Sequence, residues 1–173
     1  MTLFKGHNNI AEHIDLSMIE RLPFDYADTT QMDAITEHFR DLGIPVPDYP
    51  KDGACVYRIG QDKMPDWAIG IKNMFPEIKD PKTINIIKIM PGRFIAPHVD
   101  RLRDYDPELN PIRINVFLQD RLFGHYFEMA GETWMDYKKG DYTKIPFGTA
   151  HVVANLGYEP RYTIQISGYV TAS

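Results

Sequence analysis

Eight short β-rich segments separated by turn residues occupy the second half of this 173-residue sequence. They span residues 83–90, 93–99, 111–119, 124–129, 132–137, 141–146, 150–156 and 160–170. Short strands at this spacing are typical of an antiparallel sandwich or barrel.

The number of strands favours one fold among the antiparallel sandwiches and barrels. Eight strands in about ninety residues fit a jelly roll, or cupin-like double-stranded β-helix. The length is that of one domain, and no low-complexity linker divides the chain. We therefore expect a single, mainly β domain over residues 1–173, with a β-barrel core at 83–173 and a mixed helix and strand support at 1–82.

Two amphipathic helices are predicted before the barrel. The first spans residues 30–42 and ends before Gly43 and Pro45; its apolar positions are Met32, Ile35, Phe39 and Leu42. The second spans residues 65–75, where Pro65 suits a first turn and the shared apolar face comprises Trp67, Ile71 and Met74. Both are expected to pack on the outside of one sheet.

Composition limits the classes of partner and cofactor. No apolar run is long enough to cross a bilayer, and the N-terminus lacks the apolar stretch of a secretory signal, so we expect a cytoplasmic protein without a membrane partner. A net charge of -5 argues against nucleic acid, because phosphate binding requires clustered Lys and Arg. Cys55 is the only cysteine, so any metal ligands are His and carboxylate side chains.

The first candidate ligands are His98 and Asp100. They lie two residues apart in an extended segment, so their side chains are expected to point to the same side of a strand. By itself this pattern is more often an ordinary His–Asp pair at the surface.

His151 favours the metal interpretation. It lies in a β-pattern after the turn at 146–148, in the half of the fold expected to face the first ligands. Two His and one carboxylate form a facial triad, which holds a divalent ion on one side and leaves three positions open, as in non-haem Fe(II) proteins. A structural zinc site would need a fourth ligand, and none is evident near these residues.

Arg161 is the candidate anion-binding residue. A hairpin through residues 156–160 is expected to place it beside the His151 strand, and alternation with Thr163, Gln165 and Ser167 directs it into the barrel. A guanidinium among apolar walls requires an anion, and a dicarboxylate that reaches both Arg161 and the metal would supply one. The alternative is a solvated strand residue.

Arg113 is a second candidate buried cation and shares a strand face with Asn115. Two interpretations stay open, a contact to another carboxylate near the metal or an arginine on an edge strand. Other residues carry weaker signals: His125 is interpreted as structural, Trp134 and Tyr137 as core, and Arg101, Arg103 and Asp104 as the rim of a pocket.

Together these residues resemble a known family. The segment from about Ile84 to Val170 is similar to the aspartyl/asparaginyl β-hydroxylase and proline hydroxylase group of 2-oxoglutarate- and Fe(II)-dependent oxygenases, which share a double-stranded β-helix. The similarity rests on the ordered occurrence of Pro91-Gly92, Pro97-His98, Arg113, Gly131-Glu132-Thr133-Trp134, Gly140, His151 and Arg161.

The resemblance implies a set of residue roles. His98, Asp100 and His151 correspond to the catalytic iron ligands, and Arg161 to the partner of the distal carboxylate of 2-oxoglutarate. Arg113 corresponds to a carboxylate contact near the metal. Asn115, which stands where some relatives have a histidine, is expected with Arg113 and Arg161 among the residues that bind the co-substrate. Asparaginyl hydroxylases of this group lack the acidic ligand, whereas Asp100 keeps the full triad of the free-proline hydroxylases.

The leading hypothesis is therefore a dioxygenase that uses Fe(II), 2-oxoglutarate and O₂, with ascorbate as a supporting reductant, and releases succinate and CO₂. It would hydroxylate an unactivated C–H bond of an amino acid, either free or within a peptide or protein, with proline as the first candidate. The alternative is a cupin-like metal-binding module or isomerase without oxygenase activity. The oligomeric state is left open.

Overall fold

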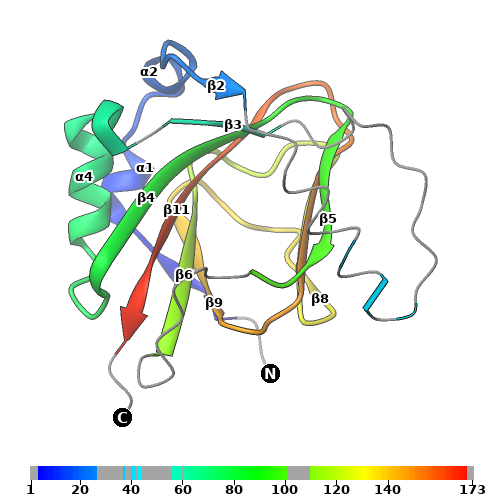
Figure 1. Cartoon of the computed structure of the whole chain (residues 1–173). Coiled ribbons are helices and arrows are strands. Elements are labelled where there is room, and N and C mark those ends of the chain that lie inside the picture. The colour runs from blue at the N-terminus through cyan, green and yellow to red at the C-terminus, as the bar shows by residue number, and fades with distance from the viewer. Residues whose placement is uncertain are drawn as a thin grey trace.

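The computed structural model describes residues 4–26, 37, 40–41, 43, 56–59, 61–100 and 110–170, and within them two antiparallel sheets face each other (Figure 1). The larger sheet has seven strands in the order β1-β9-β6-β11-β4-β3-β2, and the smaller has four in the order β5-β10-β7-β8. The larger sheet comprises β1 (Gly6–His7), β2 (Asp25–Tyr26), β3 (Val56–Arg58), β4 (Lys79–Ile89), β6 (Asn110–Phe117), β9 (Asp141–Pro146) and β11 (Arg161–Val170). The smaller comprises β5 (Arg93–His98), β7 (His125–Met129), β8 (Glu132–Thr133) and β10 (His151–Asn155).

All eight predicted strands are present, from β4 to β11. Along the chain they pass back and forth between the sheets: β4, β6, β9 and β11 belong to the larger sheet, and β5, β7, β8 and β10 to the smaller. This arrangement is a double-stranded β-helix, so the predicted mainly β fold is confirmed. The short strands β1, β2 and β3 were not predicted, and they extend the two edges of the larger sheet.

Helices cover the outer face of the larger sheet, as predicted (Figure 1). They are α1 (Asn9–Glu12), α2 (Leu16–Glu20) and α4 (Asp66–Asn73), with a 3₁₀ turn, η1, at Gln61–Lys63. The side chains of Asn8 and Asp15 cap α1 and α2 by accepting hydrogen bonds from backbone N–H groups of the first turn. Buried side chains of these helices, including Ile19 and Ile71, pack on Ile84 and other apolar residues of the sheet.

The predicted helix at 65–75 is confirmed with one correction. Its Ile71 is buried, but Met74 lies past the last helical residue and is 46% exposed. Because the helix ends at Asn73, the periodicity no longer positions Met74, and Phe75 is buried instead. Most of the predicted helix at 30–42 lies outside the described residues; residues 37, 40 and 41 are helical, and Gly43 has a φ of 67°, which suits a residue after a helix end.

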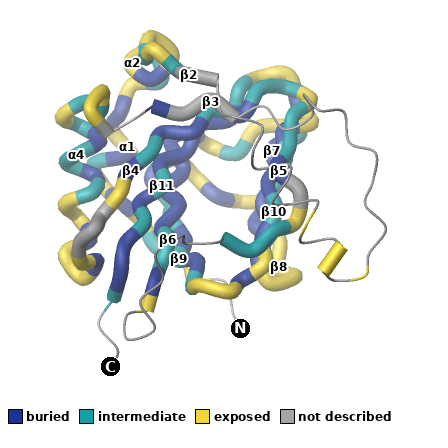
Figure 2. The backbone as a smooth tube through the Cα atoms, viewed as in Figure 1, coloured by how far each residue is buried: buried dark blue, intermediate teal, exposed yellow. Residues whose placement is uncertain are grey.

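A second apolar core fills the space between the sheets. Figure 2 shows buried residues along the strands of both sheets. It contains Ile87, Phe117, Phe127, Met129, Trp134, Tyr137, Ile145 and Val153 among others. Trp134 and Tyr137 are therefore core residues, as predicted. Among the described residues, no helix has the length and apolar character required to span a membrane.

At one end of the barrel, the start of β7 meets the link between β10 and β11. The backbone N–H of Leu156 donates to the carbonyl of Gly124 at 2.8 Å. Gly124 has a φ of +81°, and a Cβ at this position would overlap the backbone of Gly157. A glycine is needed at residue 124 for both reasons.

We predict that Gly124→Ala destabilises the protein more than Gly131→Ala. Both glycines have a φ of +81°, but a Cβ on Gly131 would meet nothing within 4 Å. Gly131→Ala should lower the free energy of unfolding by about 1–2 kcal/mol through backbone strain alone. Gly124→Ala should lower it by about 1–3 kcal/mol more, because the added methyl group also overlaps the backbone of Gly157. Equilibrium unfolding in urea measures both, and equal losses would mean that the contact relaxes without cost.

Candidate metal centre

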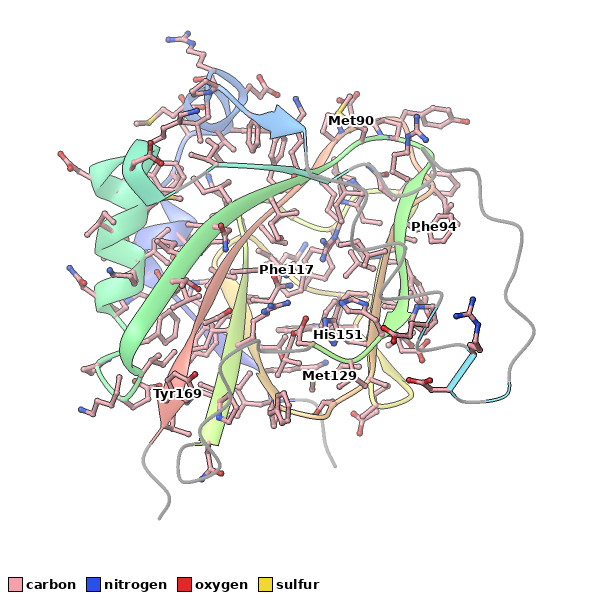
Figure 3. The ribbon with its side chains drawn as sticks, viewed as in Figure 1. Met90, Phe94, Phe117, Met129, His151 and Tyr169 are labelled. Atoms are coloured by element: carbon pink, nitrogen blue, oxygen red, sulfur yellow. The ribbon has the colours of Figure 1, made fainter. Side chains whose placement is uncertain are left out.

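The two histidines of the predicted triad lie opposite each other on neighbouring strands. β5 ends at His98 and β10 begins at His151, and these residues are paired in the antiparallel register. Residues paired in this way project from the same face of a sheet. Their ring centroids are 4.2 Å apart, and His151 lies in the space between the two sheets (Figure 3).

Asp100 completes the group just beyond the end of β5. Its carboxylate oxygens lie 3.6 Å from Nε2 of His98 and 3.7 Å from Nε2 of His151. One ligand atom from each residue fits within 4.8 Å of the others, and in the described part of the chain no further His, Cys, Asp or Glu joins them. The structure thus brings together the three residues that the sequence predicted, and this set is suited to hold a metal ion.

The backbone orients the His151 ring for this purpose. Nδ1 lies 3.1 Å from the carbonyl oxygen of Thr149, so its N–H donates to that carbonyl and Nε2 faces Asp100. Burial, reinforced by the neighbouring His98, lowers the pKa of His151 to about 4. The ring is therefore neutral near pH 7, which is the form that binds a metal.

Arg113 holds the third ligand in place. Its Nη1 donates to Oδ1 of Asp100 at 2.5 Å, and its Nε donates to the hydroxyl of Ser167 at 3.2 Å. Burial by itself raises the pKa of Asp100, but the hydrogen bond with His98 and the charge of Arg113 outweigh it and hold that pKa well below its ordinary value. Asp100 is thus a carboxylate at neutral pH.

Arg113 contacts the carboxylate of the ligand Asp100 itself. A contact of Arg113 to another carboxylate near the metal stays a prediction. The edge-strand alternative is wrong, because β6 lies between β9 and β11 inside the larger sheet. The sequence analysis did not assign a role to Ser167, although it placed this residue on the inward face of its strand.

Arg161 is buried inside the barrel with only 1% of its surface exposed. Its guanidinium carbon lies 5.3 Å from the ring centroid of Phe117 and 5.9 Å from that of Tyr137, and Nε donates to the Tyr137 hydroxyl at 3.4 Å. Nη2 is buried and has no hydrogen-bond partner among the described residues. The solvated alternative is therefore wrong, and one donor of this buried cation remains open to a ligand.

The predicted hairpin between the His151 and Arg161 strands is wrong. β10 pairs with β5 and β7 in the smaller sheet, whereas β11 pairs with β4 and β6 in the larger. Residues 156–160 therefore cross from one sheet to the other. Arg161 still points inward, but it reaches the interior from the sheet opposite His151.

An open pocket adjoins the triad at Asp100. Arg113 and Ser167 contribute polar groups to it, and its apolar lining comprises Pro111, Ile112, Ile145, Pro146 and Phe147. The predicted rim residues Arg101, Arg103 and Asp104 lie outside the described residues.

The remaining predicted residues are also located. Asn115 is buried on the inward face of β6, two residues from Arg113. His125 is fully buried, and its Nε2–H donates to the carbonyl of Glu159 at 3.1 Å, which supports the structural interpretation. Burial lowers the pKa of His125, so its ring is neutral.

Neither a protein-family model nor a curated protein matches the sequence. Among solved structures, a prolyl-4-hydroxylase from Pseudomonas putida is similar at 14% identity and a TM-score of 0.48, over 94% of this chain and 99% of the other. A predicted oxalate decarboxylase from Thermotoga maritima is similar at 14% identity and a TM-score of 0.44, over 68% and 83%. A protein from Klebsiella pneumoniae with a double-stranded β-helix domain is similar at 18% identity and a TM-score of 0.39, over 56% and 74%. Similarities at this level transfer no function to this chain.

We predict that the protein binds one divalent ion through the triad. Calorimetric titration with Co(II) should give one site, and His151→Ala should weaken it by roughly 100-fold or more, since losing an outer contact of a ligand already costs about 10- to 100-fold. His7→Gln is the matched control, because His7 also contacts carboxylates, those of Asp141 and Glu12, but is exposed at the edge of the larger sheet. Equal affinity in wild type and His151→Ala would contradict the site.

Proposed function

We propose that this protein is a 2-oxoglutarate- and Fe(II)-dependent dioxygenase that hydroxylates a C–H bond of an amino acid, free or within a peptide, and releases succinate and CO₂. One observation carries the proposal: the barrel interior contains both an open His–Asp–His ligand set and a buried guanidinium with an unpartnered donor. A triad alone suits many metal proteins. The additional buried cation calls for an anionic molecule that also reaches the metal.

The donor set fits Fe(II). His98, Asp100 and His151 would supply two imidazoles and one carboxylate on one side of the ion and leave positions open for small molecules. When bound, Fe(II) with 2-oxoglutarate and O₂ supplies the oxidant for hydroxylation, and ascorbate keeps the metal reduced. Arg113 would keep Asp100 oriented and ionised, because its hydrogen bond to Oδ1 leaves Oδ2 directed toward His151.

Arg161 would anchor the co-substrate. Its guanidinium lies against the rings of Phe117 and Tyr137, which stack on each other with centroids 3.8 Å apart and exclude water from that side. Away from water, the hydrogen bond between a carboxylate and a charged donor is stronger than it would be in water. Burial also makes a guanidinium without a counter-ion unfavourable, which favours a bound anion.

A cupin-like metal protein without oxygenase activity is the second candidate. The double-stranded β-helix and the triad support it equally well, because both features are independent of the co-substrate. The two candidates differ at Arg161, which only the dioxygenase requires. Anaerobic addition of 2-oxoglutarate to the Fe(II) protein distinguishes them, since bidentate chelation of the metal gives a visible charge-transfer band.

The pocket beside Asp100 is the proposed site for the substrate. Its proline, isoleucine and phenylalanine walls suit an apolar side chain, and Arg113 and Ser167 lie beside them. Both supply polar contacts that orient a substrate. Proline, free or peptidyl, remains the first candidate because it is compact and apolar and because Asp100 aligns the chain with proline hydroxylases.

We predict that Arg161→Lys weakens 2-oxoglutarate binding at least tenfold, or about 1.4 kcal/mol, because lysine keeps the charge but loses the paired donors of the guanidinium. The charge-transfer band at increasing 2-oxoglutarate concentration measures the dissociation constant. Arg113→Lys is the comparison, and its effect should be milder because it can keep one contact to Asp100. An unchanged dissociation constant in Arg161→Lys would mean that Arg161 does not bind the distal carboxylate of 2-oxoglutarate.

We further predict that 2-oxoglutarate turnover is stimulated by a proline-containing compound. Succinate release in the presence of Fe(II) and ascorbate would be compared across the twenty free amino acids and across peptides that contain proline, aspartate or asparagine. Stimulation by free proline alone would eliminate the peptide substrate. Stimulation by none of them, with slow uncoupled turnover still present, would eliminate amino acids as the substrate class.

A further inference from the structure

The most exposed large apolar side chains of the described residues gather at one end of the barrel. Tyr158 is 86% exposed, Phe123 77% and Leu156 69%, whereas every other exposed large apolar side chain in the described ranges is at 48% or less. Leu122, beside Phe123, is 36% exposed. We call these four residues the end patch. Single exposed apolar residues are ordinary on a protein surface, but a group of them indicates an interaction site.

Two segments that lie side by side carry the end patch, residues 121–124 before β7 and residues 156–159 before β11. The backbone N–H of Leu156 donates to the carbonyl of Gly124 at 2.8 Å. The two aromatic rings of the patch, one from each segment, stack with centroids 6.4 Å apart and planes 15° apart. Because both backbone and rings join the segments, the four side chains belong to one surface.

Buried polar side chains hold the backbone beneath this surface. Asn155 accepts from the backbone N–H of Gly157 at 3.1 Å and donates to the carbonyl of Glu159 at 2.9 Å. Nε2–H of His125 donates to the same carbonyl at 3.1 Å. These contacts fix the segment in the conformation that leaves Tyr158 in water. An apolar side chain that stays in water adds nothing to the core, so burial against a partner accounts for the end patch.

The apolar area of the end patch is what one partner of a stable pair must supply. Aromatic side chains bury about 150–250 Å² each, so Phe123 and Tyr158 expose roughly 300 Å² between them. An interface of ordinary size covers about 800 Å² on each partner, of which roughly 450 Å² is apolar. The two rings thus provide most of this area, and Leu122 and Leu156 extend it.

The charges beside the end patch favour a second copy of the same chain as the partner. Arg121 precedes Leu122 on one segment, and Glu159 follows Tyr158 on the other. In a two-fold symmetric pair, the first segment of each copy can meet the second segment of the other, which sets Arg121 opposite Glu159 twice. An anionic membrane fits less well, because it attracts clustered Lys and Arg, whereas these segments carry one charge of each sign and the chain has a net charge of -5.

We propose that the end patch is the interface of a homodimer, in which Phe123 and Tyr158 of each copy are the buried anchors. This inference is independent of the proposed function and compatible with it. β11 begins at Arg161, directly after the end patch, whereas Ser167 and its paired Arg113 line the pocket about 20 Å further along the strands. A partner bound at the end patch therefore leaves the pocket open.

Sedimentation equilibrium of the full chain tests the interface. From about 1 to about 100 μM, where modest interfaces of this size dissociate, the mass of the wild type should rise toward twice the 20.0 kDa of the chain. Phe123→Ser combined with Tyr158→Ser should raise the dissociation constant at least tenfold, because buried aromatic anchors carry most of the binding energy. The unfolding midpoint of the dilute, monomeric protein should not change, since both side chains are exposed.

The matched control combines Met18→Ser with Met74→Ser. These side chains are 48% and 46% exposed on α2 and just past α4, so the control also removes two exposed apolar groups, but from the helical side of the larger sheet. Its dissociation constant should equal that of the wild type.

A charge exchange tests the two-fold arrangement. Arg121→Glu and Glu159→Arg should each weaken self-association, because each sets like charges against each other twice. An equimolar mixture of the two variants should recover the wild-type dissociation constant, since each copy then supplies the charge that the other requires. Arg121 also donates to the carbonyl of His125 at 3.1 Å, so the unfolding midpoint of Arg121→Glu is measured first. Glu159→Arg keeps that bond and tests the charge contact by itself.

Three results would overturn the inference. One is a wild type that stays monomeric at the highest concentration. Another is a dimer whose dissociation constant is the same in the doubly substituted Phe123 and Tyr158 variant. The third is a monomer that sediments with vesicles containing phosphatidylserine and loses this binding in the same variant, which would identify a membrane as the partner. None of these results bears on 2-oxoglutarate binding, so the dioxygenase assignment is tested separately.

Discussion

The candidate site depends on the register between β5 and β10. Because His98 and His151 are directly paired, one backbone alignment places both rings on the inner face and brings them near Asp100. A slip of one residue would turn either side chain to the outer face. The register shifts between His151 and Val153, so the alignment at His151 is not simply continued from the rest of the ladder. The pairing of β5 with β10 therefore also brings the metal ligands together.

The two buried arginines near these ligands differ in their partners. Arg113 and the hydrogen bond with His98 keep Asp100 ionised, and burial keeps His151 neutral, so these two ligands are in the protonation state that a divalent ion requires. Arg161 is different, because aromatic rings surround it and in the described structure it pairs with no carboxylate. Cation–π contacts offset part of the desolvation of a guanidinium, but they provide no counter-charge. Among the described residues, Arg113 therefore has a carboxylate partner and Arg161 has none.

The strands and the ligands were predictable from the sequence because their signals are local. Alternation within 160–170 correctly placed Arg161 on the inward face, and the spacing of His98 and Asp100 correctly placed them on one side. The choice of sheet is not local: nothing in residues 150–170 distinguishes a hairpin from a crossing between sheets, and the crossing was missed for that reason. The short edge strands gave no periodic signal, as two or three residues cannot show one.

The close approach of Gly124 and Gly157 joins the two sheets at one end of the barrel. Leu156 donates to the carbonyl of Gly124, so the start of β7 in the smaller sheet is held against the segment that leads into β11 of the larger sheet. That segment ends at Arg161, whose guanidinium is buried against the rings of Phe117 and Tyr137. A side chain at either glycine would therefore displace the segment that positions this buried cation.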